Sequence, residues 1–335
     1  MTNDTTSPLG RLQRGLKSLA SVLAVSVAAS ATLLSQAGAQ TASNTPKELR
    51  IGFQKYGTLV ILKARGTLEK RLADKGITVK WTEFPFGPPL LEAINLGSID
   101  VGTVGESPPI FAQAAGADLV YIGNEPPAPS AEALIVPKGS PLKSVAELKG
   151  KRVAVAKGAN ANYLLVKVLE NAGLKYADIE VAYLAPADAR AAFESGKIDA
   201  WSIWDPFLAA AENQLNARVL ADGKGAVANH QFYLSARPYA EKYPEVIHVL
   251  LDEINKVDQW GKQNPKEVAK FIAPLIGIDL PIVEVAASRL TYGIKPVTAD
   301  VLAAQQKIAD KFFELKLVPK QIRVADAAWK HAGKP

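Results

Sequence analysis

The most informative absence in this 335-residue chain is that of cysteine, which does not occur once. Without cysteine the protein forms no disulfide and no thiolate metal site, and it has no cysteine nucleophile. It also lacks the N-terminal cysteine through which some exported proteins are attached to lipid. If the chain is exported, we therefore expect it to fold without covalent cross-links or a lipid anchor.

Histidine is also scarce, with His230, His248 and His331 as its three members. None of them follows an expected strand, and the chain has no Gly-x-Ser-x-Gly sequence to place a nucleophilic serine on a strand-to-helix turn. Clusters of His, Asp and Glu at metal-ligand spacing are missing from the sequence too. Glu106 and Asp205 could form an acid–base pair, but helix capping explains each of them better. We predict a binding protein rather than an enzyme, with no metal and no cofactor.

Neither sign of charge dominates the chain. Its 39 Lys and Arg residues and 33 Asp and Glu residues give a formal net charge of +6. The basic residues form no continuous stripe, which a nucleic-acid-binding surface would require. The small positive excess suits a small anionic ligand, and we expect no nucleic-acid partner.

Long apolar runs are lacking except at the N-terminus. Arg11, Arg14 and Lys17 precede the apolar run 19–34, and residues 37–39 (Ala-Gly-Ala) supply the small side chains that signal peptidase needs. A membrane anchor is the alternative, but serines dilute the run and no stop-transfer pattern follows. We predict a cleaved signal peptide over residues 1–39. Because no cysteine is available for a lipid anchor, we expect the periplasm as the location.

The remainder of the chain alternates between short β-rich runs and helical patterns, which is typical of βαβ units with a parallel sheet. One cycle of this alternation is followed by a second of the same order. The expected strands are 49–53, 78–84, 99–104 and 119–123, then 152–156, 179–184, 198–203 and 218–221. The expected helices are 58–75, 87–96 and 107–116, then 160–172, 187–195 and 206–215.

The two cycles also match in sequence. Gly97 and Gly196 are 99 residues apart, and each stands where a helix should end in a left-handed residue before Ile-Asp opens a strand. Residues 51–55 and 153–157 correspond at a spacing of 102 residues. The repeat predicts an α/β fold of two similar lobes with mixed, mostly parallel sheets.

Two stretches should connect the lobes. Residues 125–130 are linker-like and 131–137 lead into the second lobe, while 231–236 lead back, which predicts a hinge with two crossings. We therefore expect residues 40–130 and 236–335 to form lobe one, and residues 131–235 to form lobe two. The chain is helical in pattern from Tyr239 onward, and we expect these C-terminal helices to pack on lobe one.

A ligand of such a fold is expected beyond the carboxyl ends of the strands, where turns lead into helices. Four such turns carry polar or aromatic residues, and their helix N-termini offer free N–H groups to an anion. The predicted ligand-binding residues are Gln54, Gly105, Glu106, Ser107, Ala159, Asn160, Trp201, Trp204 and Asp205.

These residues also have structural explanations. Ser107 and Asp205 each precede a proline and are good helix N-caps. Gln54 could be an ordinary turn amide. If the strand around 200–203 is regular, Trp201 and Trp204 point to opposite faces, so that one packs inside while Trp204 faces the cleft.

Several segments resemble the aliphatic sulfonate-binding proteins of ABC importers. They follow one another in the same order as in that family: 49–55 (LRIGFQK), 83–87 (EFPFG), 97–117, 186–193 (PADARAAF), 198–206 (IDAWSIWDP), 232–241 (FYLSARPYAE) and 317–319 (LVP). The resemblance implies a type II periplasmic binding protein of the sulfonate, taurine and nitrate branch. It implies a receptor that holds a sulfonate between its lobes and delivers it to a permease and its ATPase for sulfur acquisition. We expect a monomer that meets the inner membrane only through the permease.

The resemblance places the predicted residues, Glu106 excepted, on the cleft turns of the family. A sulfonate is a permanent anion with acceptor oxygens only, so donors such as the Ser107 hydroxyl and the amides of Gln54 and Asn160 should meet it. Asp205 then caps its helix, bonds across the cleft, or pairs with the amino group of an aminosulfonate. Taurine, an aryl sulfonate, a sulfate ester and a phosphonate are alternative ligands. A sensor input receptor is an alternative to import.

Overall fold

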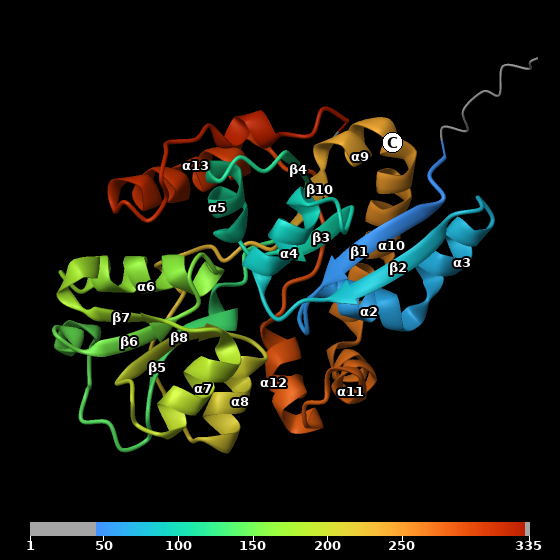
Figure 1. Cartoon of the computed structure of the whole chain (residues 1–335). Coiled ribbons are helices and arrows are strands. Elements are labelled where there is room, and N and C mark those ends of the chain that lie inside the picture. The colour runs from blue at the N-terminus through green and yellow to red at the C-terminus, as the bar shows by residue number, and fades with distance from the viewer. Residues whose placement is uncertain (1–44, 332–335) are drawn as a thin grey trace, which may run out of the picture. The chain divides into compact units, whose positions relative to one another are not determined.

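The computed structural model describes residues 45–331, so the signal peptide predicted over residues 1–39 lies outside the described residues. Within this range, two five-stranded sheets have the same internal order (Figure 1). The strands are β1 (Glu48–Phe53), β2 (Thr78–Glu83), β3 (Val101–Val104), β4 (Leu119–Asn124), β5 (Glu132–Val136), β6 (Arg152–Val155), β7 (Glu180–Tyr183), β8 (Ala200–Trp204), β9 (Arg218–Asp222) and β10 (Phe232–Ala236).

The helices fill the connections between the strands and most of the C-terminal third. The α-helices are α2 (Thr58–Arg65), α3 (Thr67–Ala73), α4 (Gly87–Asn95), α5 (Pro108–Ala114), α6 (Asn160–Asn171), α7 (Pro186–Glu194), α8 (Phe207–Gln214), α9 (Arg237–Lys242), α10 (Pro244–Gln263), α11 (Pro265–Ile276), α12 (Leu280–Arg289) and α13 (Ala299–Glu314). Short 3₁₀ turns occur at η1 (Pro129–Ala131), η2 (Val145–Leu148), η3 (Tyr176–Asp178) and η4 (Val324–Ala327).

The first sheet has the order β2-β1-β3-β10-β4, and the second has the order β7-β6-β8-β5-β9. In the first sheet β1 pairs in parallel with β2 and β3, whereas β10 runs antiparallel between β3 and β4. In the second sheet β6 pairs in parallel with β7 and β8, and β5 runs antiparallel between β8 and β9. The prediction of two similar, mixed and mostly parallel sheets is confirmed.

The expected strands and helices between residues 48 and 222 are present, with ends within two residues of their predicted positions. The expected helix 58–75 is the exception, because Gly66 adopts a left-handed conformation (φ 63°) and divides it into α2 and α3. Gly97 and Gly196 also have positive φ angles, of 69° and 68°, as the repeat predicted for the residues that follow α4 and α7. The left-handed conformation of Gly97 and Gly196 was therefore predictable from the sequence.

Two strands were missed. Strands β5 and β10 lie in stretches 131–137 and 231–236, which were interpreted as connections between lobes. Both stretches are rich in apolar and β-forming residues, and each strand is buried in the interior of its sheet. Strand β10 pairs in the first sheet, although the segment expected to form lobe two extends to residue 235.

The C-terminal helices mostly cover the first sheet, as predicted. Helix α10 packs on α2 and α3, α11 packs on α2, and α13 packs on α5. Helix α12 departs from this expectation, because it also contacts α8 next to the second sheet. There Ile282 and Ala286 of α12 pack against Ala209 and Ala210 of α8.

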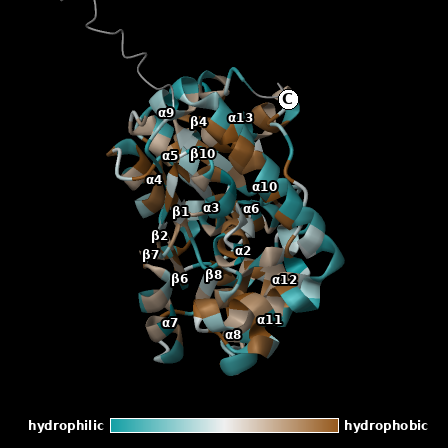
Figure 2. Ribbon diagram, turned by 90° about the vertical axis from the view of Figure 1, so that its right-hand side faces the viewer, coloured by the Kyte–Doolittle hydropathy of each residue, from teal (hydrophilic) through white to brown (hydrophobic). Residues whose placement is uncertain are grey.

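Hydrophobic and hydrophilic residues separate along the helices α10 to α13, so that these helices bury one side and expose the other (Figure 2). Buried apolar side chains form separate cores for the two sheets, with Leu49, Ile51 and Val101 in the first and Val153, Val155 and Ile203 in the second. Between residues 45 and 331, no helix combines the length and the apolar character needed to cross a membrane.

Candidate functional site

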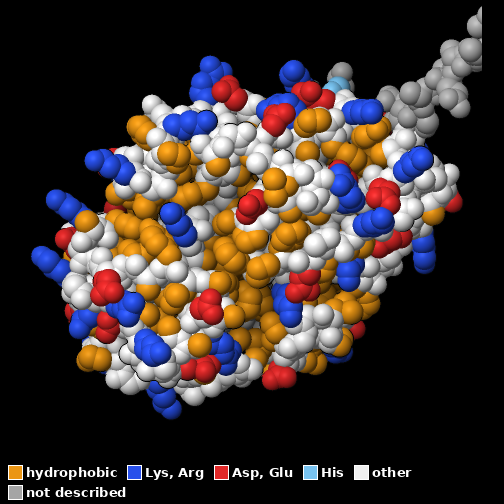
Figure 3. Space-filling model, in the orientation of Figure 1, with side chains coloured by type: hydrophobic (Ala, Val, Ile, Leu, Met, Phe, Trp, Pro, Cys, Tyr) orange, Lys and Arg blue, Asp and Glu red, His pale blue; other side chains and the backbone are white. Residues whose placement is uncertain are grey.

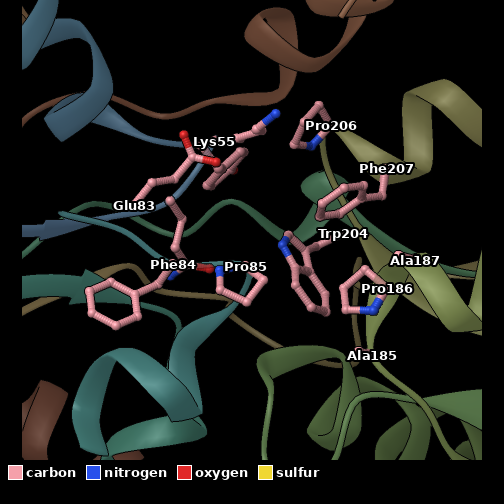
Figure 4. A pocket seen from close by; sticks show the side chains of 12 residues that line it. Lys55, Glu83, Phe84, Pro85, Ala185, Pro186, Ala187, Trp204, Pro206 and Phe207 are labelled. Carbon is pink, nitrogen blue, oxygen red and sulfur yellow. The ribbon is translucent and has the colours of Figure 1, made fainter. Parts of the chain in front are cut away.

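A pocket of about 220 Å³ lies where turns at the carboxyl ends of strands from both sheets meet (Figure 4). It is lined by the turns that follow β1, β2, β7 and β8, and we call it the strand-end pocket. Its lining residues are Gln54, Lys55, Tyr56, Glu83, Phe84, Pro85, Ala185, Pro186, Ala187, Trp204, Pro206 and Phe207. The site therefore lies at the edge of the sheets where ligands of α/β folds are expected.

Aromatic and proline side chains make up most of the pocket wall. The rings of Trp204 and Phe207 meet edge to face with their centroids 6.0 Å apart. The indole nitrogen of Trp204 faces the space between the turns (Figure 4) and makes no hydrogen bond to another described residue. The wall thus combines apolar surface with an N–H group that is free to donate to a ligand.

Tyr56 supplies a second unused donor. Its hydroxyl is buried and has no hydrogen-bond partner between residues 45 and 331. Its ring packs against Ala128, Ala131 and Leu290. Burial, and after it the charge of Asp205, raises the pKa of Tyr56 well above its usual value, so the hydroxyl keeps its proton. A buried hydroxyl without a partner calls for an explanation, and a bound acceptor would supply one.

Two charged residues also line the pocket. The ammonium group of Lys55 donates to the carbonyl oxygen of Ile276, at the end of α11, over 2.8 Å. Glu83 is exposed and is the last residue of strand β2. The sequence prediction had assigned anion binding to neutral donors alone, and it missed both charges.

Gln54 holds the first turn in place. Its side-chain amide donates to the carbonyl oxygen of Thr103 over 2.9 Å, which ties the turn after β1 to the neighbouring strand β3. Gln54 also lines the pocket, so the same residue holds the turn and borders the site.

The other predicted turns meet at a separate place. A methyl group added to Gly105 would lie 2.7 Å from the Cβ atom of Asn160, so the turn after β3 touches the start of α6. The side-chain amide of Asn160 donates to Glu132 Oε2 over 2.6 Å and to Asn229 Oδ1 over 3.0 Å. The amide hydrogens of Asn160 are thus engaged within the protein. Ala159 is buried beside it as the N-cap residue of α6.

Three buried polar atoms at or beside this contact lack a partner among the described residues: Glu106 Oε1, Ser107 Oγ and Glu132 Oε1. Burial raises the pKa of Glu106 to about 7, although the backbone N–H groups of His230 and Asn229 oppose the rise. Burial also raises the pKa of Glu132, and the nearby charge of Glu106 adds to this effect. A carboxyl group that keeps its proton can donate a hydrogen bond, so this cluster is able to meet an acceptor.

Asp205 makes both of the protein contacts that were considered for it. Its Oδ1 atom accepts the backbone N–H of Ala209 in the first turn of α8 over 3.0 Å. It also accepts from Arg289 Nη1 of α12 over 3.3 Å, and Arg289 Nη2 donates to Glu212 over 2.7 Å. Burial raises the pKa of Asp205 to about 7 against the opposing effect of Arg289. Asp205 thereby caps α8 and links it to α12.

The comparisons with known proteins place the chain in a family. A family profile described as the substrate-binding domain of the ABC-type glycine betaine transport system matches residues 47–271. A protein of Escherichia coli (strain K12) that is described as an aliphatic sulfonates-binding protein is 47% identical over 296 residues, which cover 87% of this chain and 91% of that protein. The chain belongs to the aliphatic sulfonate-binding proteins.

Solved structures of the same family share the fold. The alkanesulfonate-binding protein SsuA of Xanthomonas axonopodis pv. citri, bound to MOPS, is 43% identical with a TM-score of 0.81 and covers 85% of this chain and 98% of its own. The periplasmic aliphatic sulphonate binding protein SsuA of Escherichia coli is 46% identical with a TM-score of 0.78 and covers 85% of this chain and 93% of its own.

The fold alone does not separate binding from catalysis. The desulfurization enzyme DszB has a TM-score of 0.62 at 16% identity, with coverage of 84% of this chain and 96% of its own. The relatives of high identity are binding proteins.

Of the nine residues predicted for the site of this sulfonate-binding family member, Gln54 and Trp204 line the strand-end pocket. Gly105, Glu106, Ser107, Ala159, Asn160 and Asp205 lie in the contacts described above. Trp201 is placed differently, in the core of the second sheet, with 1% of its surface exposed and its ring 5.8 Å from that of Phe193. Its odd spacing from Trp204 on one strand explains why the two rings face opposite sides.

The pocket residues that the sequence prediction missed come mostly from the turns after β2 and β7. These are Glu83, Phe84, Pro85, Ala185, Pro186 and Ala187. The rule that selected the other turns applies to them equally, because β2 and β7 occupy equivalent edge positions in the two sheets. The sequence therefore contained the information needed to include these turns, but the prediction considered only two turns of each repeat.

Proposed function

We propose that this chain is a periplasmic receptor that binds an aliphatic sulfonate in the strand-end pocket and delivers it to an ABC permease and its ATPase. On this proposal residues 1–39 are removed on export. The first sheet with its helices forms lobe one and the second sheet forms lobe two, and the lobes close on the ligand by movement at the two crossings near 125–131 and 223–231.

The observation that carries the proposal is the pairing of unused donors with an apolar wall. Trp204 offers an N–H group to the pocket, Tyr56 lines the pocket and has a buried hydroxyl without a partner among the described residues, and most of the wall consists of aromatic and proline side chains. An alkanesulfonate has the matching character, since its head has acceptor oxygens only and its tail is apolar. Lys55 adds a positive charge and Glu83 a negative charge at the same pocket.

The relatives support the ligand class. The Xanthomonas protein was solved with MOPS, a sulfonate, and the family profile refers to glycine betaine, which carries a carboxylate. Both compounds present a small anionic head, and the high-identity relatives favour the sulfonate.

We also propose that the chain does not catalyse a reaction. The two carboxylates considered for acid–base work make contacts within the protein: Asp205 accepts from Ala209 and Arg289, and Glu106 Oε2 accepts from the backbone N–H of His230. The purified protein should therefore leave sulfonates and sulfate esters intact over long incubation. Release of sulfite, sulfate or an alcohol at a rate proportional to protein concentration would contradict this part of the proposal.

Calorimetry with butanesulfonate and butylphosphonate in a phosphate-based buffer tests the ligand class. The buffer must be free of sulfonates, because MOPS itself is bound by a relative. We expect the sulfonate to bind, and a sulfonate at 100 times its Kd to stabilise the protein by about 2.7 kcal/mol in thermal unfolding. Preferential binding of the phosphonate, or of glycine betaine, would refute the assignment.

Matched substitutions test the site. Trp204→Phe keeps an aromatic ring but removes the N–H donor, and Tyr56→Phe removes only the hydroxyl, so each should weaken sulfonate binding by about tenfold, the loss of one hydrogen bond to a charged acceptor. Trp201→Phe is the control, since Trp201 lies in the core on the other side of the same strand. It should lower stability while the affinity stays unchanged. Equal affinities for wild type, Trp204→Phe and Tyr56→Phe would show that the ligand binds somewhere other than in this pocket.

A further inference from the structure

A groove of about 340 Å³ adjoins the strand-end pocket. It lies between α4 on one side and the ends of β6 and β7 on the other, and we call it the α4 groove. Its lining residues are Phe86, Pro88, Pro89, Glu92, Ala156, Lys157, Tyr183, Leu184 and Ala185. Ala185 lines both hollows, with Leu184 on the groove side and Pro186 on the pocket side, so the two lie next to each other at this residue.

The floor and walls of the groove are largely apolar. Tyr183 is 42% exposed, which leaves much of a large ring open at the end of β7. Phe86 packs partly against the core of the second sheet from the start of α4. The ammonium group of Lys157 lies over the Tyr183 ring, 5.6 Å from its centroid, which is a cation–π contact at the side of the groove opposite α4.

The surface of the molecule shows the same feature. Hydrophobic side chains gather across the middle of one face, over the region between α4 and α7 (Figure 3). Glu92 stands on the α4 side and Lys157 on the other, and neither forms an ion pair between residues 45 and 331. An apolar strip with charged rims suits an extended hydrocarbon chain that leaves a deeper pocket.

The size of the strand-end pocket requires such an exit for long ligands. Its volume of about 220 Å³ is below the roughly 300–1,000 Å³ of ordinary small-molecule sites, and the α4 groove brings the combined space into that range. A pocket of this size suits a sulfonate head with a short alkyl tail. A longer tail extends out of the pocket, and the α4 groove is the neighbouring hollow, with Ala185 in the lining of both.

We propose that the α4 groove is the tail subsite for sulfonates whose alkyl chains extend beyond the strand-end pocket. The head stays in the strand-end pocket, and the tail passes Ala185 and lies against Tyr183 and Phe86. This inference rests on the proposed function, because the groove takes only the distal part of a ligand whose head is bound next door. Each methylene that becomes fully buried should tighten binding by up to about fourfold.

Calorimetry with ethanesulfonate, butanesulfonate and octanesulfonate tests the subsite. In wild type, octanesulfonate should bind at least about tenfold more tightly than butanesulfonate, since the open groove buries only part of each added methylene. Tyr183→Ala should abolish this gain and leave the affinity for ethanesulfonate unchanged. Tyr183→Phe should keep the gain, because it removes only the hydroxyl that lies 3.3 Å from that of Tyr176. Val219→Ala, which truncates another exposed side chain of the same sheet, should keep it as well.

The outcomes separate this inference from the proposed function. If ethanesulfonate and butanesulfonate bind but octanesulfonate gains nothing, or if the gain survives in Tyr183→Ala, the tail subsite is overturned and the receptor function stands. If no sulfonate binds the wild-type protein, the proposed function fails and the tail subsite fails with it.

Discussion

Replacing Glu106 by Gln removes one ionisable group from the contact between the two sheets and keeps a side chain of the same length. Glu106 is 1% exposed, and its Oε2 atom accepts the backbone N–H of His230 over 3.2 Å, a bond that an amide oxygen can also accept. Its titratable neighbours include the buried Glu132 and the half-buried Tyr163, and burial and then its charge raise the pKa of both. His230 and Lys307 line the same hollow as Glu106. The substitution therefore tests whether burial controls the protonation of this group.

The expected effect follows from the pKa of Glu106, which burial raises from 4.5 to about 7. Below pH 4.5 the group is protonated in both the folded and the unfolded chain. Between pH 4.5 and 7 the unfolded chain loses this proton while the folded protein keeps it, so stability falls as the pH rises. Above pH 7 both states are ionised and the loss is complete. At 1.36 kcal/mol for each pKa unit, Glu106 should cost the folded protein about 3 kcal/mol between pH 4.5 and pH 8.

Urea unfolding at a series of pH values measures this difference. Glu106→Gln should gain about 3 kcal/mol relative to wild type on going from pH 4.5 to pH 8, because the variant lacks the group that must ionise in a buried place. Other buried carboxyls contribute to both proteins, so the difference between the two curves isolates Glu106 and its coupling to Glu132. Glu284→Gln, at an exposed position of α12, is the control and should follow the wild-type curve. Parallel curves for wild type and Glu106→Gln would refute the reasoning.

Three further predictions concern the contacts around the site. Gly105→Ala should weaken butanesulfonate binding by about tenfold in calorimetry, because its methyl group would press on Asn160 at 2.7 Å where the two sheets meet; an unchanged affinity would show that this contact is not needed for binding. Arg289→Met should lower the free energy of unfolding by roughly 3 kcal/mol at pH 8, because it leaves the buried Asp205 carboxylate without its cation. The loss should be smaller at pH 5, where Asp205 can take up a proton and become neutral, and a loss independent of pH would contradict this. Trp201→Ala should lower the same free energy by about 3–5 kcal/mol by leaving a cavity in the second core, and a loss below 1 kcal/mol would be inconsistent with its burial.

Most of the fold could be predicted because the sequence shows the same order of strands and helices twice, so each half supports the interpretation of the other. Gly97 and Gly196 each ended a helix where the pattern required it, and the strand-to-helix order followed from hydrophobic periodicity. Strands β5 and β10 were missed although their residues are apolar and β-forming, because they lie outside the repeated strand-to-helix pattern. Each enters its sheet directly from a crossing and pairs with strands distant in sequence, and local patterns do not show such partners.

The sequence predicted the edge of the sheets at which the candidate site lies, but it did not predict which residues share a pocket there. Gln54 and Trp204 were found because both follow buried strands, and both line the strand-end pocket. Whether each of the other predicted residues lies in the pocket or in a separate contact depends on which turn of one sheet faces which turn of the other. Gly105 meets Asn160, whereas the turn of Gln54 shares a pocket with Trp204, and this pairing depends on packing that no local sequence pattern encodes.

The position of β10 has a consequence for the order in which the chain can fold. Strand β4 has β10 as its sheet neighbour, so the first sheet cannot join β4 to β3 until residues 232–236 are available. The second sheet is continuous in sequence from Glu132 to Asp222 and has no such dependence. A chain that emerges from its N-terminus can therefore complete the second sheet while the first still has an open gap. Until synthesis has passed Ala236, the exposed edges of β3 and β4 are where we expect mispairing and chaperone contact to concentrate.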